Sequence, residues 1–110
     1  MGDKGFLGEF EQMVLLAVLR LKEGAYGVTV RQEIEKRTGA RVSRGAVYIT
    51  LDRLQKKGYL ESHVADPTPE RGGRPRRYYK VRRDGLVALR DSRTAFQKMW
   101  AGLQPVVKKL

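Results

Sequence analysis

An unbroken apolar run from Met13 to Leu19 limits the fold more than any other feature of this 110-residue sequence. The run lies within a longer segment whose apolar residues recur at helical steps of three and four, which predicts a helix that ends before Glu23. These periodic residues are Leu7, Phe10, Val14, Ala17 and Leu21. Since seven consecutive apolar residues surround a helix on all sides, this helix must be covered on more than one side. A chain this short can hardly supply that cover alone, so we expect a second copy to contribute.

The same run is too short to cross a bilayer, and Glu9 and Glu11 precede it where a signal peptide would carry basic residues. The chain has no cysteine and one histidine, which excludes disulfide frameworks, thiolate nucleophiles and zinc sites. The residues also show no Ser/His/Asp set and no convergent carboxylates. We therefore expect a single cytoplasmic domain that is not an enzyme and that needs no metal or cofactor.

The next two helices are predicted from their ends. The second is expected to run from about Thr29, as its N-cap, to Gly39. The third is expected from Ser43 to Lys57, because Ser43 can cap its first turn and basic residues with a glycine end it. Only a short turn separates the two helices.

Two strands and a fourth helix follow. Side chains alternate at the strand period over residues 60–65 and again over 76–81. The segment between them, 66–75, holds three of the four prolines of the chain, which predicts a projecting hairpin loop. Asp84 is placed to cap a last helix that extends to Gln104, where a proline ends or kinks it.

This order of elements predicts an α+β fold, mostly helical, that is a winged helix-turn-helix with a C-terminal dimerisation helix. We assign residues 1–83 to a DNA-binding region, with a recognition helix at about 43–57 and a wing at about 60–81. Residues 84–110 are assigned to the dimerisation helix of the same compact domain.

The net charge of +11 is concentrated in the middle of the chain, because residues 41–83 hold twelve basic and four acidic side chains. This distribution predicts an anionic partner. On a helical wheel Val47, Leu51 and Leu54 converge on the core. The other faces of the third helix carry the candidate DNA contacts, Ser43, Arg44, Gly45, Tyr48, Ile49, Arg53 and Lys56. Ordinary solvated charges are the alternative interpretation of Arg53 and Lys56.

The hairpin loop supplies a second group of DNA-binding candidates, Arg71, Gly72, Gly73, Arg74 and Arg76. Guanidinium donors on a flexible tip can follow the edge of a groove. The alternative is a disordered, solvated loop.

Several segments resemble the PadR family of bacterial transcriptional regulators over residues 7–90. The most telling are Ala25-Tyr26-Gly27, Gly45-Ala46-Val47-Tyr48 and Gly72-Gly73-Arg74 followed by Tyr78-Tyr79. The resemblance implies a DNA-binding repressor that dimerises through its first and last helices, with Tyr48 and its neighbours at the DNA. It also suggests that a flat aromatic effector can bind beside Trp100, as happens between the last helices of some relatives.

Apolar residues at steps of four and three in the last helix predict a dimer seam. With the first helix, the candidate interface residues are Val14, Val18, Leu86, Leu89, Phe96, Trp100 and Leu103. The alternative is that this stripe packs on its own domain.

We therefore expect a homodimer that binds a palindromic operator in double-stranded DNA as a transcriptional regulator, a repressor by resemblance. The alternative is a winged-helix module that binds RNA or docks a protein. Ile49 favours DNA, because a thymine methyl group in the major groove offers an apolar contact.

Overall fold

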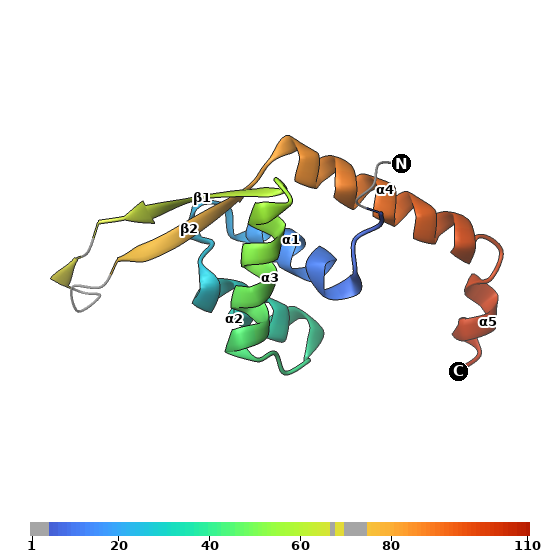
Figure 1. The fold of residues 1–110 in the computed structure, drawn as a ribbon. Helices are drawn as coiled ribbons and strands as arrows, with labels where there is room; N and C mark the ends of the chain where they lie inside the picture. The colour runs from blue at the N-terminus through green and yellow to red at the C-terminus, as the bar shows by residue number, and fades with distance from the viewer. Residues whose placement is uncertain (1–4, 67, 70–74) are drawn as a thin grey trace.

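The structure, a computed structural model, describes residues 5–66, 68–69 and 75–110 and has its helices and strands in the predicted order (Figure 1). The elements are α1 (Glu9–Leu21), the 3-10 turn η1 (Lys22–Gly24), α2 (Gly27–Thr38), α3 (Arg44–Lys56), β1 (Leu60–Ala65), β2 (Arg76–Val81), α4 (Arg83–Trp100) and α5 (Gln104–Lys108). Three helices precede a two-stranded antiparallel wing, so the predicted winged helix-turn-helix with a C-terminal helix is confirmed.

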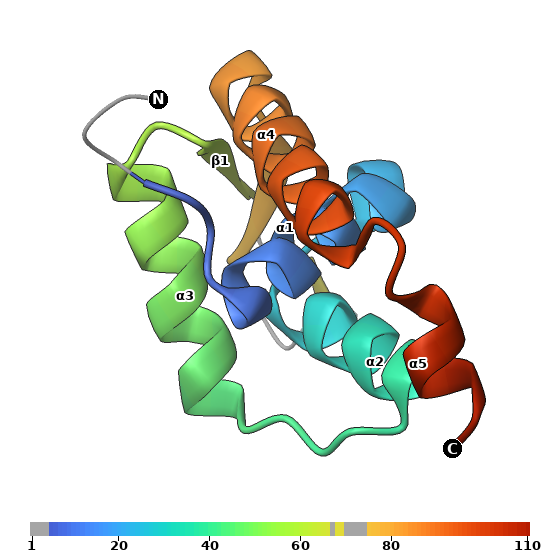
Figure 2. The same cartoon turned by 90° about the vertical axis from the view of Figure 1, so that its right-hand side faces the viewer.

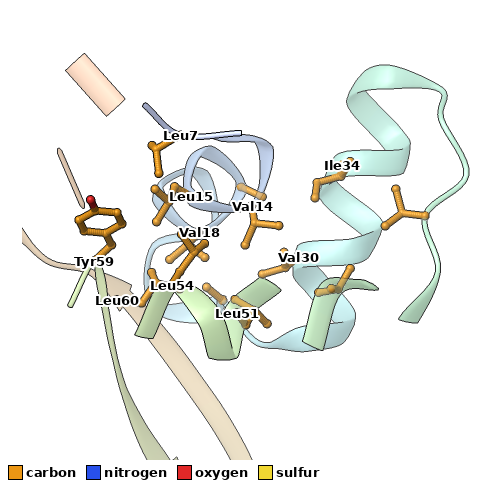
Figure 3. Close-up of a cluster of buried hydrophobic side chains, with 14 residues drawn as sticks. Leu7, Val14, Leu15, Val18, Val30, Ile34, Leu51, Leu54, Tyr59 and Leu60 are labelled. Carbon is orange, nitrogen blue, oxygen red and sulfur yellow. The ribbon is translucent and has the colours of Figure 1, made fainter. Parts of the chain in front are cut away.

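Helix α1 is central, because α2, α3, α4 and β2 all contact it (Figures 1 and 2). Val14, Leu15 and Val18 are completely or almost completely buried and meet residues of α2 and α3 in one apolar cluster (Figure 3). The placement of Val14 and Val18 in a dimer interface is therefore wrong: the chain's own helices cover that side of α1. Leu16 and Leu19 are the apolar residues of this helix that stay exposed.

The start of α2 differs from the prediction. The helix begins at Gly27, two residues before Thr29, which lies in its first turn. The hydroxyl oxygen of Thr29 accepts a hydrogen bond from the Tyr26 N–H (3.0 Å) and donates to the Gly24 carbonyl (2.6 Å). Thr29 thus bonds from within the first turn to the residues that precede the helix, whereas the prediction placed it before the helix as the N-cap.

The wing stem is attached to the helices by its backbone. The strands pair from Leu60 with Val81 to Ala65 with Arg76. The Tyr79 N–H donates to the Ala25 carbonyl (2.9 Å), and the Arg82 N–H donates to the Tyr59 carbonyl (2.9 Å). These two bonds set the direction of the wing relative to α2 and to the end of α3.

The C-terminal helix is shorter than predicted. It begins at Arg83, so Asp84 lies in its first turn, and it ends at Trp100. Gly102 has a φ of 80°, in the left-handed region, and a new helix, α5, starts at Gln104. Pro105 is accommodated in the first turn of α5, where a missing N–H costs nothing. Helix α4 runs away from the three-helix core, and α5 lies beyond its far end (Figure 1).

Gly85 fixes where α4 leaves the wing. A Cβ atom at this residue would lie 2.5 Å from the Tyr59 carbonyl oxygen and 2.9 Å from Cγ1 of Val81. Because the nearer atom belongs to the backbone, it cannot move aside without disturbing the junction of α3 and β1. The absence of a side chain is what lets α4 pack here.

We predict that Gly85→Ala lowers the free energy of unfolding by about 1–3 kcal/mol, the usual cost of overpacking a close contact. Thermal and urea unfolding measure the effect. Gly45→Ala in α3 is the matched control: a Cβ atom there would meet nothing within 4 Å, so stability should be unchanged or higher. Equal stability of Gly85→Ala and the unaltered chain would contradict the close approach.

Candidate nucleic-acid interface

Helix α3 separates its residues into a buried and an exposed face, as the helical wheel predicts. Val47, Leu51 and Leu54 are completely buried in the core. Ile49 is 62% exposed and Tyr48 46% exposed. The exposed apolar side chain of Ile49 therefore stands among polar neighbours, on the face predicted to meet the DNA bases.

The remaining side chains predicted on this helix are also at the surface. Ser43, Arg44, Gly45, Arg53 and Lys56 are all exposed. Lys56 forms an ion pair with Asp52 (3.0 Å), an acidic neighbour that was not among the residues predicted for this face. The exposed surface of α3 thus combines cations, one carboxylate and apolar area, a mixture able to contact both phosphates and base edges.

The turn before α3 is held by side chains of α2 that were not predicted to take part in the site. Nε of Arg31 donates to the Val42 carbonyl (2.8 Å), and Glu35 accepts from the Val42 N–H (2.9 Å). Ser43 caps α3 as predicted, because its hydroxyl accepts from the Ala46 N–H (3.1 Å). The i, i+4 spacing of Arg31 and Glu35 is typical of a helical ion pair and gives no sign of a role in the turn.

The other end of α3 is held by an ion pair with α1. Nζ of Lys57 lies 2.9 Å from Oε2 of Glu11, whose Oε1 accepts from the Gly8 N–H (3.0 Å). Burial acts to raise the pKa of Glu11, but the hydrogen bonds from Lys57 and Gly8 and the charges of Lys57 and Arg53 outweigh it and lower that pKa. Glu11 therefore stays ionised and ties the end of α3 to α1.

Aromatic contacts connect the wing stem to the start of α2. The rings of Tyr26 and Tyr78 meet edge to face at 5.5 Å, and His63 stacks on Tyr78 at 5.7 Å. The guanidinium group of Arg76 lies 4.0 Å from the Tyr26 ring centroid and donates to the Tyr78 hydroxyl (3.3 Å). Arg76, predicted to contact DNA, is half-buried and engaged with the stem of the wing.

A second set of polar contacts connects the wing to α3 directly. Arg77 donates to the hydroxyl of Ser62 (2.9 Å), and that hydroxyl donates to the side chain of Gln55 (3.0 Å). Since Gln55 belongs to α3, these two hydrogen bonds connect the wing stem to that helix.

The predicted contacts at the wing tip, Arg71, Gly72, Gly73 and Arg74, lie outside the described residues. Across the described ranges, no group of three or more His, Cys, Asp or Glu side chains is arranged to hold a metal ion. Nor does any helix described here have the length and apolar character required to cross a membrane.

Four of the five predicted interface residues of the C-terminal helix line one side of a groove between α1 and α4. Its volume is about 950 Å³, and its apolar lining comes from Leu16, Leu19, Leu86, Leu89, Phe96 and Trp100. Leu89 is half-buried against the chain's own core, whereas Phe96 is 56% and Trp100 45% exposed. Leu103 is 51% exposed and does not line the groove. Leu86, at the start of α4, is also 47% exposed. The chain's own core thus partly covers Leu89 and leaves Leu86, Phe96 and Trp100 open.

Three helices, a two-stranded wing and a C-terminal helix place the chain among winged helix-turn-helix proteins. The sequence profile of the transcriptional regulator PadR-like family matches residues 15–91, so the chain belongs to that family. This agrees with the resemblance recognised in the sequence.

Individual relatives support the assignment. The chain is 38% identical over 76 residues to the transcriptional regulator Rv3488 of Mycobacterium tuberculosis, a match that spans 67% of this chain and 64% of that relative. It is similar to a PadR-like transcription factor from Bacteroides fragilis, with 26% identity, a TM-score of 0.71 and 88% of each chain covered. A PadR-like regulator from Bacillus cereus shows 25% identity and a TM-score of 0.64 over 91% of this chain and 88% of that one.

We predict that Glu11→Gln lowers the free energy of unfolding at pH 7 by about 1–3 kcal/mol, because it removes a charged hydrogen bond. The pKa of Glu11 is lower in the folded chain than in the unfolded chain. The difference from the unaltered protein is therefore complete above the pKa of an unfolded glutamate, about 4.3, and shrinks as the pH falls further and passes the lower pKa of the folded chain.

Urea unfolding between pH 3 and pH 7 measures this effect. Glu9→Gln, in the same first turn of α1, is the control and should cost less than about 1 kcal/mol, since its main interaction is with the helix dipole. Stability profiles of Glu11→Gln and the unaltered chain that stay parallel down to pH 3 would contradict the role of the ion pair.

Proposed function

We propose that the chain is a sequence-specific double-stranded DNA-binding protein that represses transcription as a homodimer on a palindromic operator. The observation that carries the proposal is the exposed apolar side chain of Ile49 between Arg53 and Tyr48 on the outer face of α3. In a DNA major groove such a side chain finds thymine methyl groups, while the cations contact guanine edges and phosphates.

The attachment of α3 to other elements at both of its ends supports the proposal. The Arg31 and Glu35 side chains brace the turn before it, and Glu11 holds Lys57 after it. A recognition helix that reads bases must keep its side chains in register with base edges, and rigid supports serve that requirement. Membership in a family of transcriptional regulators supports a regulatory role and not an enzymatic one.

The open groove between α1 and α4 supports the homodimer. Its exposed residues Leu16, Phe96 and Trp100 form an apolar surface that a second copy of the same helices would cover in an isologous interface. Two recognition helices related by a twofold axis would then face inverted half-sites of an operator. We include in the proposal a flat aromatic effector in contact with Trp100, which lines the same groove.

We predict that Ile49→Ala changes the preferred DNA sequence and weakens binding to the preferred duplex by about 1 kcal/mol per half-site, because less apolar surface is buried against the bases. Arg53→Ala should relax specificity at the base pair that Arg53 contacts and weaken the free energy of DNA binding by about 1–3 kcal/mol. Lys98→Ala, which removes a charge from the exposed surface of α4, is the control and should leave the preferred sequence unchanged. An Ile49→Ala protein with unchanged affinity and preference would overturn the assignment of this face to bases.

We predict that the protein sediments at micromolar concentration with about twice the chain mass of 12.5 kDa. Phe96→Glu should return it to a single chain, because a carboxylate would be buried in the groove without a partner. Met99→Glu introduces the same charge in the same region of α4, at an exposed residue outside the groove lining, and should stay dimeric. An unaltered protein that sediments as one chain would refute the dimer.

A further inference from the structure

Gly27, the first residue of α2, is in direct contact with the aromatic ring of Tyr48 on α3. A Cβ atom at residue 27 would lie 2.5 Å from Cε1 and Cζ of Tyr48 and 2.6 Å from its hydroxyl oxygen. Non-bonded carbon atoms pack at about 3.5–4.0 Å, so any side chain here would push the ring away by about 1 Å. Gly27 is buried, and Tyr48 is what covers it on this side.

The backbone gives no other reason for a glycine at this place. The glycines with positive φ are Gly5, Gly39, Gly58 and Gly102 among the described residues, and Gly27 is not one of them. In a helix, alanine is favoured over glycine by about 0.5–1 kcal/mol. The Tyr48 ring occupies the space that a side chain at residue 27 would fill, so a larger residue there would have to displace the ring.

The contact with Gly27 determines the position of the Tyr48 phenol ring. Tyr48 lines a cleft of about 420 Å³ together with Gly27 and with Arg76, Arg77 and Tyr79 of the wing. The Tyr79 N–H to Ala25 carbonyl bond holds the wing against the start of α2, so the walls of the cleft are fixed. The ring thus rests on the backbone of α2 with its hydroxyl beside Gly27, in the cleft that residues of α2, α3 and the wing line.

We propose that Gly27 is a positioning residue for DNA binding: its missing side chain lets the Tyr48 ring rest on α2, where the phenol can donate to a DNA phosphate in the cleft between α3 and the wing. The proposal rests on the proposed function, since it assigns the cleft to the DNA backbone. Phosphate contacts of this kind set the orientation of a protein on the duplex. Gly27 acts on DNA only through the place it gives to Tyr48.

A double-mutant cycle tests this role. The probe is the fluorescein-labelled duplex that the unaltered protein recovers from a random double-stranded pool. Gly27→Ala should weaken binding roughly tenfold, the loss expected for one displaced hydrogen bond to a charged group. In a Tyr48→Ala background the same substitution should change affinity less than about twofold, because the ring that it displaces is gone.

Gly24→Ala is the matched control. Gly24 lies three residues earlier, a Cβ atom there would meet nothing within 4 Å, and its substitution should leave affinity unchanged. Tyr48→Phe keeps the ring and removes the hydroxyl, and it should weaken binding as much as Gly27→Ala does. In NMR spectra of the free protein, the Tyr48 ring should give nuclear Overhauser contacts to the Hα atoms of Gly27. In the Gly27→Ala protein, the contacts between the Tyr48 ring and the Hα of residue 27 should be absent.

Three outcomes would overturn the proposal: no change in affinity for Gly27→Ala, an equal loss with and without the Tyr48 ring, or a Tyr48→Phe protein that binds normally. If Gly27→Ala lowers the thermal unfolding midpoint, the double variant with Tyr48→Ala should regain it, and a double variant that stays destabilised would also contradict the contact. A protein that recovers no duplex from the pool contradicts the proposed function itself, a result distinct from any of these.

Discussion

The burial of α1 among the other helices and β2 is the interaction on which the rest of the structure depends. Each completely buried Val or Leu side chain contributes about 1.5–3 kcal/mol relative to an exposed one, and α1 supplies Val14, Leu15 and Val18. Because α2 and α3 pack on different sides of α1, the angle between them follows from that packing (Figure 3). The polar contacts at the two ends of α3 then fix its position along the core surface.

Several polar side-chain contacts connect one element to another. Glu11 joins α1 to the end of α3, the Arg31 and Glu35 pair joins α2 to the start of α3, and Ser62 joins the wing to the side of α3. In addition, the buried hydroxyl of Ser92 accepts from the Leu7 N–H (3.0 Å), which ties α4 to the segment before α1.

Much of the fold could be predicted from the sequence, because α3 and both strands have strong local signals. The Ser43 cap and the core positions Val47, Leu51 and Leu54 follow from spacing alone, and the structure confirms them.

The features that were predicted wrongly depend on contacts between distant residues. Val14 and Val18 looked available to a partner because the cover provided by α2 and α3 is not visible in a local pattern. Likewise the helix after Asp84 ends early because the backbone leaves the helical region at Ala101, where ψ is 124°, and Gly102 then takes a left-handed conformation. Periodicity is insensitive to such a break. Within the candidate site, Ile49, Arg53 and Tyr48 followed from the helical wheel, whereas the roles of Gly27 and Glu11 depend on contacts made across the fold, which have no signature in local spacing.

The most direct test of the account is selection from a random double-stranded DNA pool by the purified protein, followed by sequencing of the bound duplexes. Two copies of α3 related by a twofold axis predict an inverted repeat whose half-site centres lie about one helical turn, or a multiple of it, apart. A pool with no enriched duplex motif, or a preference for structured RNA over the selected duplex, would contradict it.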